Sequence, residues 1–264
     1  MADLTKIAAM IIDMDGVLWR GETFLPGVSE FFEFLRARSI RFILATNNAT
    51  TSPERVMSRL AEIGVNIDRE EVLTTAAATA TFLKDLKPAG SQVFLIGETA
   101  LQVALEEAGF SITSSHEDAD AVVVGFDREL TYIKLAKASF AVAEGAVFVG
   151  TNPDPSFPVE NGQAPGNGAI LAAVQTTTGV EPIIVGKPEP HLYHQASARL
   201  DTPPERVLVL GDRLTTDILG AHRSGMASAL LLTGVTSKDE AEASSVKPDW
   251  IFDDLFQLID AMAE

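Results

Sequence analysis

The stretch IIDMDGVLWRG, residues 11–21, places two acidic side chains one position apart directly after an apolar run. Asp13 and Asp15 repel each other when both are charged. Two interpretations are therefore open for this stretch. Either the pair belongs to a solvated turn, or a cation lies between the two carboxylates.

Short apolar runs alternate with longer segments of helical periodicity along the chain. This alternation is typical of βαβ units, so we expect an α/β fold with a parallel sheet. The runs that resemble buried strands are 7–12, 41–45, 92–97, 121–126, 146–150, 182–186, 206–211 and 227–232. The segments expected to be helical are 27–39, 52–64, 98–110, 129–145 and 253–264.

The middle of the chain resembles a unit of its own, because three strand candidates and their helices lie between the segments with polar strand ends. We therefore expect a small α/β cap domain at 81–181, inserted into a discontinuous catalytic core at 1–80 and 182–264.

The composition limits the class of function. There are 264 residues, no cysteine and a formal net charge of −17. The missing cysteines exclude disulfides and thiol chemistry, and with no signal-peptide or membrane-span pattern we expect a cytoplasmic protein with no membrane partner. A strongly acidic chain repels polyanions, so no nucleic-acid polymer is expected as a partner.

Four strand candidates end on polar residues that a core would not use. These residues are Asp13 with Asp15; Thr46, Asn47 and Asn48; Lys187; and Asp212 with Asp217. Ligands bind outside the carboxyl ends of the strands in an open parallel sheet, so we expect these side chains to converge in one crevice. Any one of them alone is also explained by a turn or a helix cap.

Several carboxylates around one point are costly without a cation, and oxygen ligands without histidine or cysteine suit Mg²⁺. Asp13 is then placed to attack phosphorus, and Asp15 to protonate the leaving oxygen and later take a proton from water. Asp212 would complete the set of metal ligands, and Asp217 would support these ligands without binding the metal itself. Lys187 would neutralise Asp13 and the transferring phosphoryl group.

The motifs DMDG (13–16), TNN (46–48), GKP (186–188) and GDRLTTD (211–217) resemble, in order and type, those of the haloacid dehalogenase superfamily of phosphatases. The segments DGVLWRGETFLPGV, VGTNPD, PGNGAI and VGKPEP are similar to its NagD-like members. The resemblance implies a Rossmann-like core with an α/β cap of the C2 type and Mg²⁺ as cofactor. The resemblance implies Asp13 as nucleophile, Asp15 as acid and base, Thr46, Asn47 and Lys187 as phosphate-binding residues, and Asp212 with the carbonyl of Asp15 as metal ligands. We also expect Asn48 among the substrate-binding residues and Asp13 and Asp15 among the metal-binding residues.

The same resemblance implies a small phosphate monoester as substrate, from the nucleotide, sugar, glycolate or pyridoxal phosphate classes. The oligomeric state stays open, since the cap could pair with a second copy to form a homodimer. The turn-rich loop 151–165, with Phe157 and Glu160, is expected either to set specificity or simply to connect. Two other functions stay open: a phosphotransferase or phosphomutase that passes the phosphoryl group to a sugar, and a non-catalytic protein that binds a phosphorylated metabolite.

Overall fold

The computed structural model describes residues 3–159 and 161–263, which form two compact units. Of the described residues, unit 1 comprises 3–46, 53–73 and 187–263, and unit 2 comprises 47–52, 74–159 and 161–186. The boundary expected at 80/81 falls inside helix α3 (Thr75–Leu86), and the structure divides the chain just before that helix. Within the described residues, none of the helices has the length and apolar character needed to cross a membrane.

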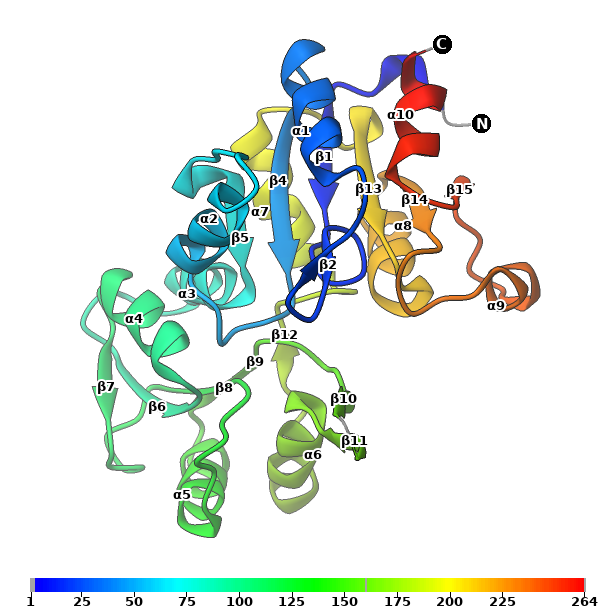
Figure 1. Cartoon of the computed structure of the whole chain (residues 1–264). Coiled ribbons are helices and arrows are strands. Elements are labelled where there is room, and N and C mark those ends of the chain that lie inside the picture. The colour runs from blue at the N-terminus through cyan, green and yellow to red at the C-terminus, as the bar shows by residue number, and fades with distance from the viewer. Residues whose placement is uncertain (1–2, 160, 264) are drawn as a thin grey trace. The chain divides into compact units, whose positions relative to one another are not determined.

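Unit 1 is built on a six-stranded sheet (Figure 1). Its strand order is β15 (Trp250–Phe252), β14 (Ala227–Leu231), β13 (Val207–Gly211), β1 (Ala9–Ile12), β4 (Arg41–Thr46) and β5 (Val72–Thr74). The ladders from β15 to β4 are parallel, and Ile11 lies opposite both Val209 and Ile43. All four residues of β1 are buried, which explains its unbroken apolar run: a central parallel strand is covered on both faces.

Helices cover both faces of this sheet. Side chains of α1 (Val28–Ala37), α2 (Pro53–Ala61) and α10 (Leu255–Ala263) pack with Met10, Ile12 and Leu44 in one core. The other face carries α7 (Pro190–Leu200), which contacts β1 and β4, and α8 (Leu219–Arg223), which contacts β14. The remaining elements of the unit are η1 (Leu4–Lys6), the hairpin β2 (Trp19–Arg20) and β3 (Thr23–Phe24), η2 (Arg69–Glu71), η3 (Pro204–Arg206), the π-helical turn η4 (Leu214–Ile218) and α9 (Lys238–Ala243).

Unit 2 has a parallel sheet of its own, with five strands. Their order is β12 (Ile183–Ile184), β9 (Val147–Gly150), β8 (Ala121–Val124), β6 (Gln92–Ile96) and β7 (Ser111–Thr113). The unit also contains α3, α4 (Thr99–Glu107), α5 (Tyr132–Ala143) and α6 (Asn167–Thr178). An α/β fold with parallel sheets is confirmed.

Two sequence-based expectations need correction. The strand at 182–186 was expected in the sheet of the core, but β12 pairs with β9 in unit 2, so the chain returns to unit 1 only at Lys187. The segment 151–165 was expected to be a loop, but it contains an antiparallel hairpin of β10 (Ser156–Val159) and β11 (Gly162–Pro165). Phe157 lies in this hairpin with its ring 5.1 Å from that of Phe126, and Glu160 lies outside the described residues.

Candidate active site

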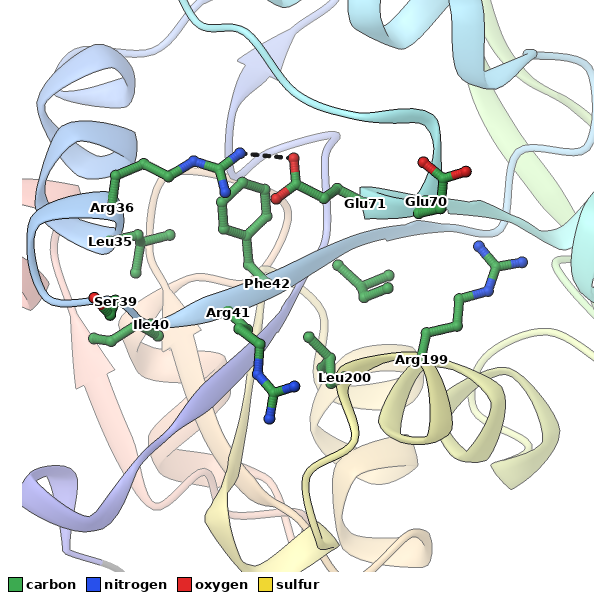
Figure 2. A pocket seen from close by; sticks show the side chains of 11 residues that line it. Leu35, Arg36, Ser39, Ile40, Arg41, Phe42, Glu70, Glu71, Arg199 and Leu200 are labelled. Atoms are coloured by element: carbon green, nitrogen blue, oxygen red, sulfur yellow. Dashed lines mark hydrogen bonds and ion pairs between the residues drawn. The ribbon is translucent and has the colours of Figure 1, made fainter.

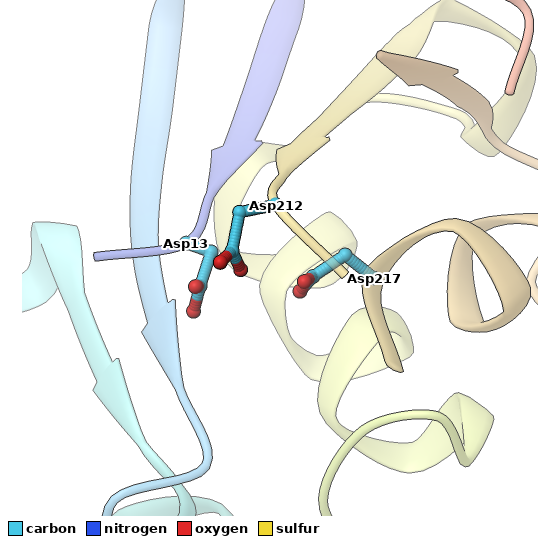
Figure 3. Close-up of side chains that lie close together, drawn as sticks. All are labelled: Asp13, Asp212 and Asp217. Atoms are coloured by element: carbon cyan, nitrogen blue, oxygen red, sulfur yellow. The ribbon is translucent and has the colours of Figure 1, made fainter. Parts of the chain in front are cut away.

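Three carboxylates meet at the carboxyl edge of the sheet of unit 1 (Figure 3). Asp13 follows β1, Asp212 follows β13, and Asp217 lies in the π-helical turn η4. The neighbouring strands β1 and β13 are parallel, with Ile12 opposite Leu210, so their following residues emerge side by side. Among the described residues these three form the acidic group that could hold a metal ion, with one oxygen of each within 4.8 Å of the others.

Lys187 lies between two of these carboxylates. Its Nζ donates to Oδ1 of Asp13 at 2.7 Å and to Oδ1 of Asp217 at 2.8 Å. The side chain is 3% exposed, and that of Asp217 is 2% exposed. Burial disfavours the charged ammonium, but Asp13 and Asp217 outweigh burial and raise the pKa of Lys187 above its ordinary value. Lys187 therefore stays protonated throughout the physiological range.

Asp212 has one oxygen bonded and one without a partner. Its Oδ2 accepts a hydrogen bond of 2.7 Å from the backbone N–H of Val235, and Oδ1 is buried with no hydrogen-bond partner among the described residues. Burial, together with the nearby Asp217 carboxylate, raises the pKa of Asp212 to about 6. A buried carboxylate oxygen without a donor costs free energy, and a cation placed against it removes that cost.

The nucleophile candidate Asp13 experiences the same surroundings. Burial raises its pKa well above the ordinary value, Lys187 opposes this shift, and the charges of Asp217 and Asp212 add to it. By contrast, both oxygens of Asp217 have donors. Oδ1 accepts from Lys187, and Oδ2 accepts from the N–H of Arg213 and the hydroxyl of Thr216, each at 3.2 Å.

Asp15 lies apart from this group. In the described part of the chain, its side chain is not among the carboxylates close enough to share an ion. Instead, its Oδ1 accepts a hydrogen bond of 3.0 Å from the indole Nε1 of Trp19. Between the two aspartates and this tryptophan the chain turns at Gly16, which has φ of +82°. A Cβ on Gly16 would lie 2.4 Å from Oδ2 of Asp212, so the turn requires glycine both for its backbone angle and for space.

The TNN motif lies across the boundary of the two units. Thr46 ends β4 and is buried in unit 1 at the same sheet edge as Asp13, since Ile12 lies opposite Leu44. Asn47 belongs to unit 2, where its Nδ2 donates to Oδ2 of Asp154 at 3.2 Å. Asn48 is exposed, and its Oδ1 accepts from the N–H and the hydroxyl of Thr50, an Asx turn.

Sequence reasoning missed several residues that shape this site. Tyr193 is fully buried on α7, and its hydroxyl donates to the carbonyls of Thr216 and Asp217, which fixes the turn that carries Asp217. Gly234 approaches so close that a Cβ there would lie 1.9 Å from Oδ2 of Asp212. Tyr193 lies in an ordinary helical segment and Gly234 in an ordinary loop, so neither carried a sequence signal for this role.

A separate hollow lies at the opposite end of the same sheet (Figure 2). It has a volume of about 590 Å³ and is lined by residues from the end of α1, the start of β4, η2 and the end of α7. Arg36 in this hollow pairs with Glu71 at 2.7 Å and stacks over the ring of Phe42. None of the predicted site residues lines the hollow, so the carboxylate group remains the candidate active site.

Comparison with known proteins gives consistent matches over nearly the whole chain. Residues 10–111 match the family model of the haloacid dehalogenase-like hydrolases, and residues 184–258 match a second, HAD-hydrolase-like model. The acid sugar phosphatase of Staphylococcus aureus (strain USA300) is 39% identical over 256 residues, which cover 97% of this chain and 98% of that protein.

Solved structures are similar in both sequence and fold. The p-nitrophenyl phosphatase from Archaeoglobus fulgidus is 33% identical with a TM-score of 0.92, covering 97% of this chain and 99% of that chain. The glycerol phosphate phosphatase from Mycobacterium tuberculosis, solved in complex with magnesium, is 35% identical with a TM-score of 0.88. That match covers 98% of this chain and 78% of the other.

Proposed function

Because the chain belongs to the haloacid dehalogenase-like hydrolases, and among them to the NagD-like phosphatases of small phosphate monoesters, we propose that it hydrolyses these esters with Mg²⁺ through a phosphorylated Asp13. The observation that carries the proposal is the buried ammonium of Lys187 among three carboxylates; within the part of the chain that the structure describes, one oxygen of Asp212 has no hydrogen-bond partner. The chain is a phosphoric monoester hydrolase, as its relatives are.

The donor set supports a hard divalent ion. Three carboxylates and one ammonium leave a charge of about −2 if all are ionised, which a divalent cation neutralises. The ligands proposed from side chains are Asp13 and Oδ1 of Asp212, with the carbonyl of Asp15. Asp217 is proposed to support them, because its oxygens already accept from Lys187, Arg213 and Thr216. Mg²⁺ prefers such oxygen ligands and keeps part of its water shell.

The first half of the reaction transfers the phosphoryl group to Asp13. Lys187 bonds to Oδ1 of Asp13, which leaves Oδ2 to attack phosphorus. As the Oδ2–P bond forms, the bond from phosphorus to the ester oxygen breaks, and Asp15 gives its proton to that oxygen to release the alcohol. Lys187 and Thr46 are proposed to bind the phosphoryl oxygens, and the ion, when bound, supplies positive charge against the carboxylates and the transferring group.

The second half returns the enzyme to its starting state. Asp15, now a carboxylate, takes a proton from a water molecule whose oxygen bonds to phosphorus. The bond between phosphorus and Oδ2 of Asp13 then breaks, and inorganic phosphate is released. One carboxyl group thus serves as acid and then as base, which is why its position matters in both steps.

The experiment that tests this proposal uses the purified chain with Mg²⁺ and 4-nitrophenyl phosphate. We expect phosphate release that stops with a chelator, a phosphorylated protein after acid quenching, and neither product in Asp13→Asn. Lys247→Met, far along the chain from the motifs, is the matched control and is expected to keep full turnover. Turnover by Asp13→Asn would refute the assignment of Asp13 as the nucleophile. Undiminished turnover in the presence of the chelator would refute the requirement for a metal ion.

We propose sugar phosphates and glycerol phosphate as the first substrates to test, because a relative at 39% identity is named acid sugar phosphatase and one at 35% identity is named glycerol phosphate phosphatase. Nucleotide, glycolate and pyridoxal phosphates complete the panel. The preferred class is the one with the highest kcat/KM, since this ratio measures discrimination between competing substrates.

A further inference from the structure

The side chain of Asp15 is held by a tryptophan four residues further along the chain. Asp15 is exposed, and its Oδ1 accepts a hydrogen bond of 3.0 Å from Nε1 of Trp19. The backbone closes the same turn, because the N–H of Gly16 donates to the carbonyl of Trp19 at 2.7 Å and the N–H of Leu18 donates to the carbonyl of Met14 at 2.8 Å. An exposed carboxylate therefore has a fixed partner within its own turn.

Trp19 itself is held on more than one side. It is 5% exposed, and the ring of Phe24 meets it edge to face with centroids 5.9 Å apart. The guanidinium of Arg59, from α2, lies over the Trp19 ring at 4.1 Å from its centroid and donates to the carbonyl of Gly21 in the tip of the hairpin. Arg59 thus contacts the ring face of the indole and also bonds the tip of the hairpin that carries it, which together restrict the position of the ring.

The indole restricts which oxygen of Asp15 can carry the proton. Nε1 of tryptophan is a donor only, so the oxygen that it bonds acts as an acceptor. In the acid form of Asp15 the proton then lies on Oδ2, the oxygen that the indole does not bond. This selects one oxygen for proton transfer and limits the rotamers of an otherwise exposed side chain, which is the positioning that a general acid requires.

We propose that Trp19 is a positioning residue for Asp15, and that Arg59 acts through Trp19 by holding its ring. The inference rests on the proposed function, in which Asp15 protonates the leaving oxygen. It predicts a dependence on the leaving group. Alkyl phosphates such as glycerol phosphate need a proton on the departing oxygen, whereas 4-nitrophenolate leaves readily as an anion. Loss of positioning therefore harms the alkyl ester more.

The test compares kcat/KM for glycerol phosphate and 4-nitrophenyl phosphate in Trp19→Phe, which keeps a ring beneath Arg59 and removes the N–H. The ratio kcat/KM reports the steps up to release of the alcohol, so it does not include the later attack of water. General acid catalysis typically contributes about 10²–10⁴-fold. We expect kcat/KM for glycerol phosphate to fall at least about tenfold further than for 4-nitrophenyl phosphate.

A double-mutant cycle shows whether Trp19 acts through Asp15. Asp15→Asn is expected to produce a larger loss of the same selectivity, and adding Trp19→Phe to it should change the substrate ratio no further. Trp250→Phe is the matched control, because Trp250 is the other tryptophan of the chain and lies in β15; it should leave the ratio unchanged. Arg59→Met should shift the ratio of the two kcat/KM values in the same direction by a smaller factor. If Trp19→Phe does not fold, this variant tests the role of Trp19 instead, and an unchanged ratio would overturn it.

The results distinguish failure of the positioning role of Trp19 from failure of the acid role of Asp15. Equal losses for both substrates in Trp19→Phe, with a selective loss in Asp15→Asn, would overturn the role of Trp19 and leave the proposed function standing. A further selective loss when Trp19→Phe is added to Asp15→Asn would also overturn it. An unchanged ratio in Asp15→Asn would instead overturn the acid role of Asp15, and the role of Trp19 with it.

Discussion

Replacing Lys187 by methionine removes the one ammonium that lies between two buried carboxylates. Its Nζ is 2.7 Å from Asp13 and 2.8 Å from Asp217, and these three side chains are 3%, 13% and 2% exposed. Removing one partner of a buried ion pair typically costs about 3–5 kcal/mol, because the other charge is left without compensation. Here two carboxylates lose their partner, so we expect the free energy of unfolding of the metal-free protein to fall by at least about 3 kcal/mol at pH 8.

Urea unfolding in EDTA, followed by tryptophan fluorescence, measures this loss. Both tryptophans, Trp19 and Trp250, lie in unit 1, so the signal follows the unit that carries the site. A loss of about 4 kcal/mol corresponds to a midpoint about 2 M lower for a typical urea dependence. Lys6→Met is the control: it removes an exposed pair with Asp3, and such exposed pairs contribute little to the free energy of unfolding.

The pH dependence of the Lys187→Met variant has a definite sign. Without the ammonium, the folded-state pKa of Asp13, already well above its ordinary value, rises further, while the unfolded chain keeps the ordinary value of 3.8. The folded state then binds more protons than the unfolded state, so the stability of the variant rises as the pH falls from 8 to 5, by up to about 1.4 kcal/mol per pH unit for each proton. A loss below about 1 kcal/mol in EDTA that does not change with pH would refute this account.

Three further predictions follow from the same site. Gly16→Ala should lower kcat/KM by about 10²-fold, because its Cβ would push Asp212, whereas Gly64→Ala has a similar φ of +79° with open space around it and should only lose about 1 kcal/mol of stability. Because the pKa of Asp212 is raised to about 6, protons should compete with Mg²⁺, so calorimetry should show Kd rising as the pH falls below 6; a Kd constant from pH 7 to 5 would contradict this. Asp212→Asn should weaken Mg²⁺ binding at least tenfold at pH 7, because it removes a charged ligand. It should also raise the melting temperature of the metal-free protein, since it removes an uncompensated buried charge, and a lower melting temperature would show that the Asp212 carboxylate does not destabilise the metal-free fold.

The sequence predicts the α/β class well, because long apolar runs such as those of β1, β4 and β13 can satisfy their burial only at the centre of a covered sheet. The three-residue strands β5, β7 and β15 were missed, since so few residues show no periodicity. Assignment of β12 to the wrong sheet has a different cause. β12 has only two residues, and which sheet such a short strand joins depends on the path of the chain in the fold. The apolar pattern of 182–186 contains no information on that path.

The charged residues of the site were predictable because each of them is expensive to bury alone. Asp13 and Asp212 directly follow strands of the unit 1 sheet, and Lys187 follows the apolar run 182–186. At such positions only mutual compensation, or an ion, explains a charged side chain. The residues that hold them were not predictable in this way. The hydroxyl of Tyr193, the N–H of Val235 and the indole of Trp19 are ordinary groups whose role depends on where the fold places their donors. Sequence reasoning therefore finds the charges of a site more readily than the neutral donors that orient them.

Charge balance connects the fold of this site to its chemistry. Burial raises the pKa values of Asp13 and Asp212, and the neighbouring carboxylates add to this rise. With Lys187 protonated and Asp13, Asp212 and Asp217 all ionised, the site would carry an excess charge of about −2. In the proposed mechanism a bound divalent ion would offset this excess and favour the charged state of both carboxylates, which nucleophilic attack and metal binding require. The same carboxylates that destabilise the metal-free protein thereby make ion binding favourable, so stability and activity should respond to Mg²⁺ together. Turnover that requires Mg²⁺, in a protein whose melting temperature Mg²⁺ leaves unchanged, would separate the two responses and refute this account.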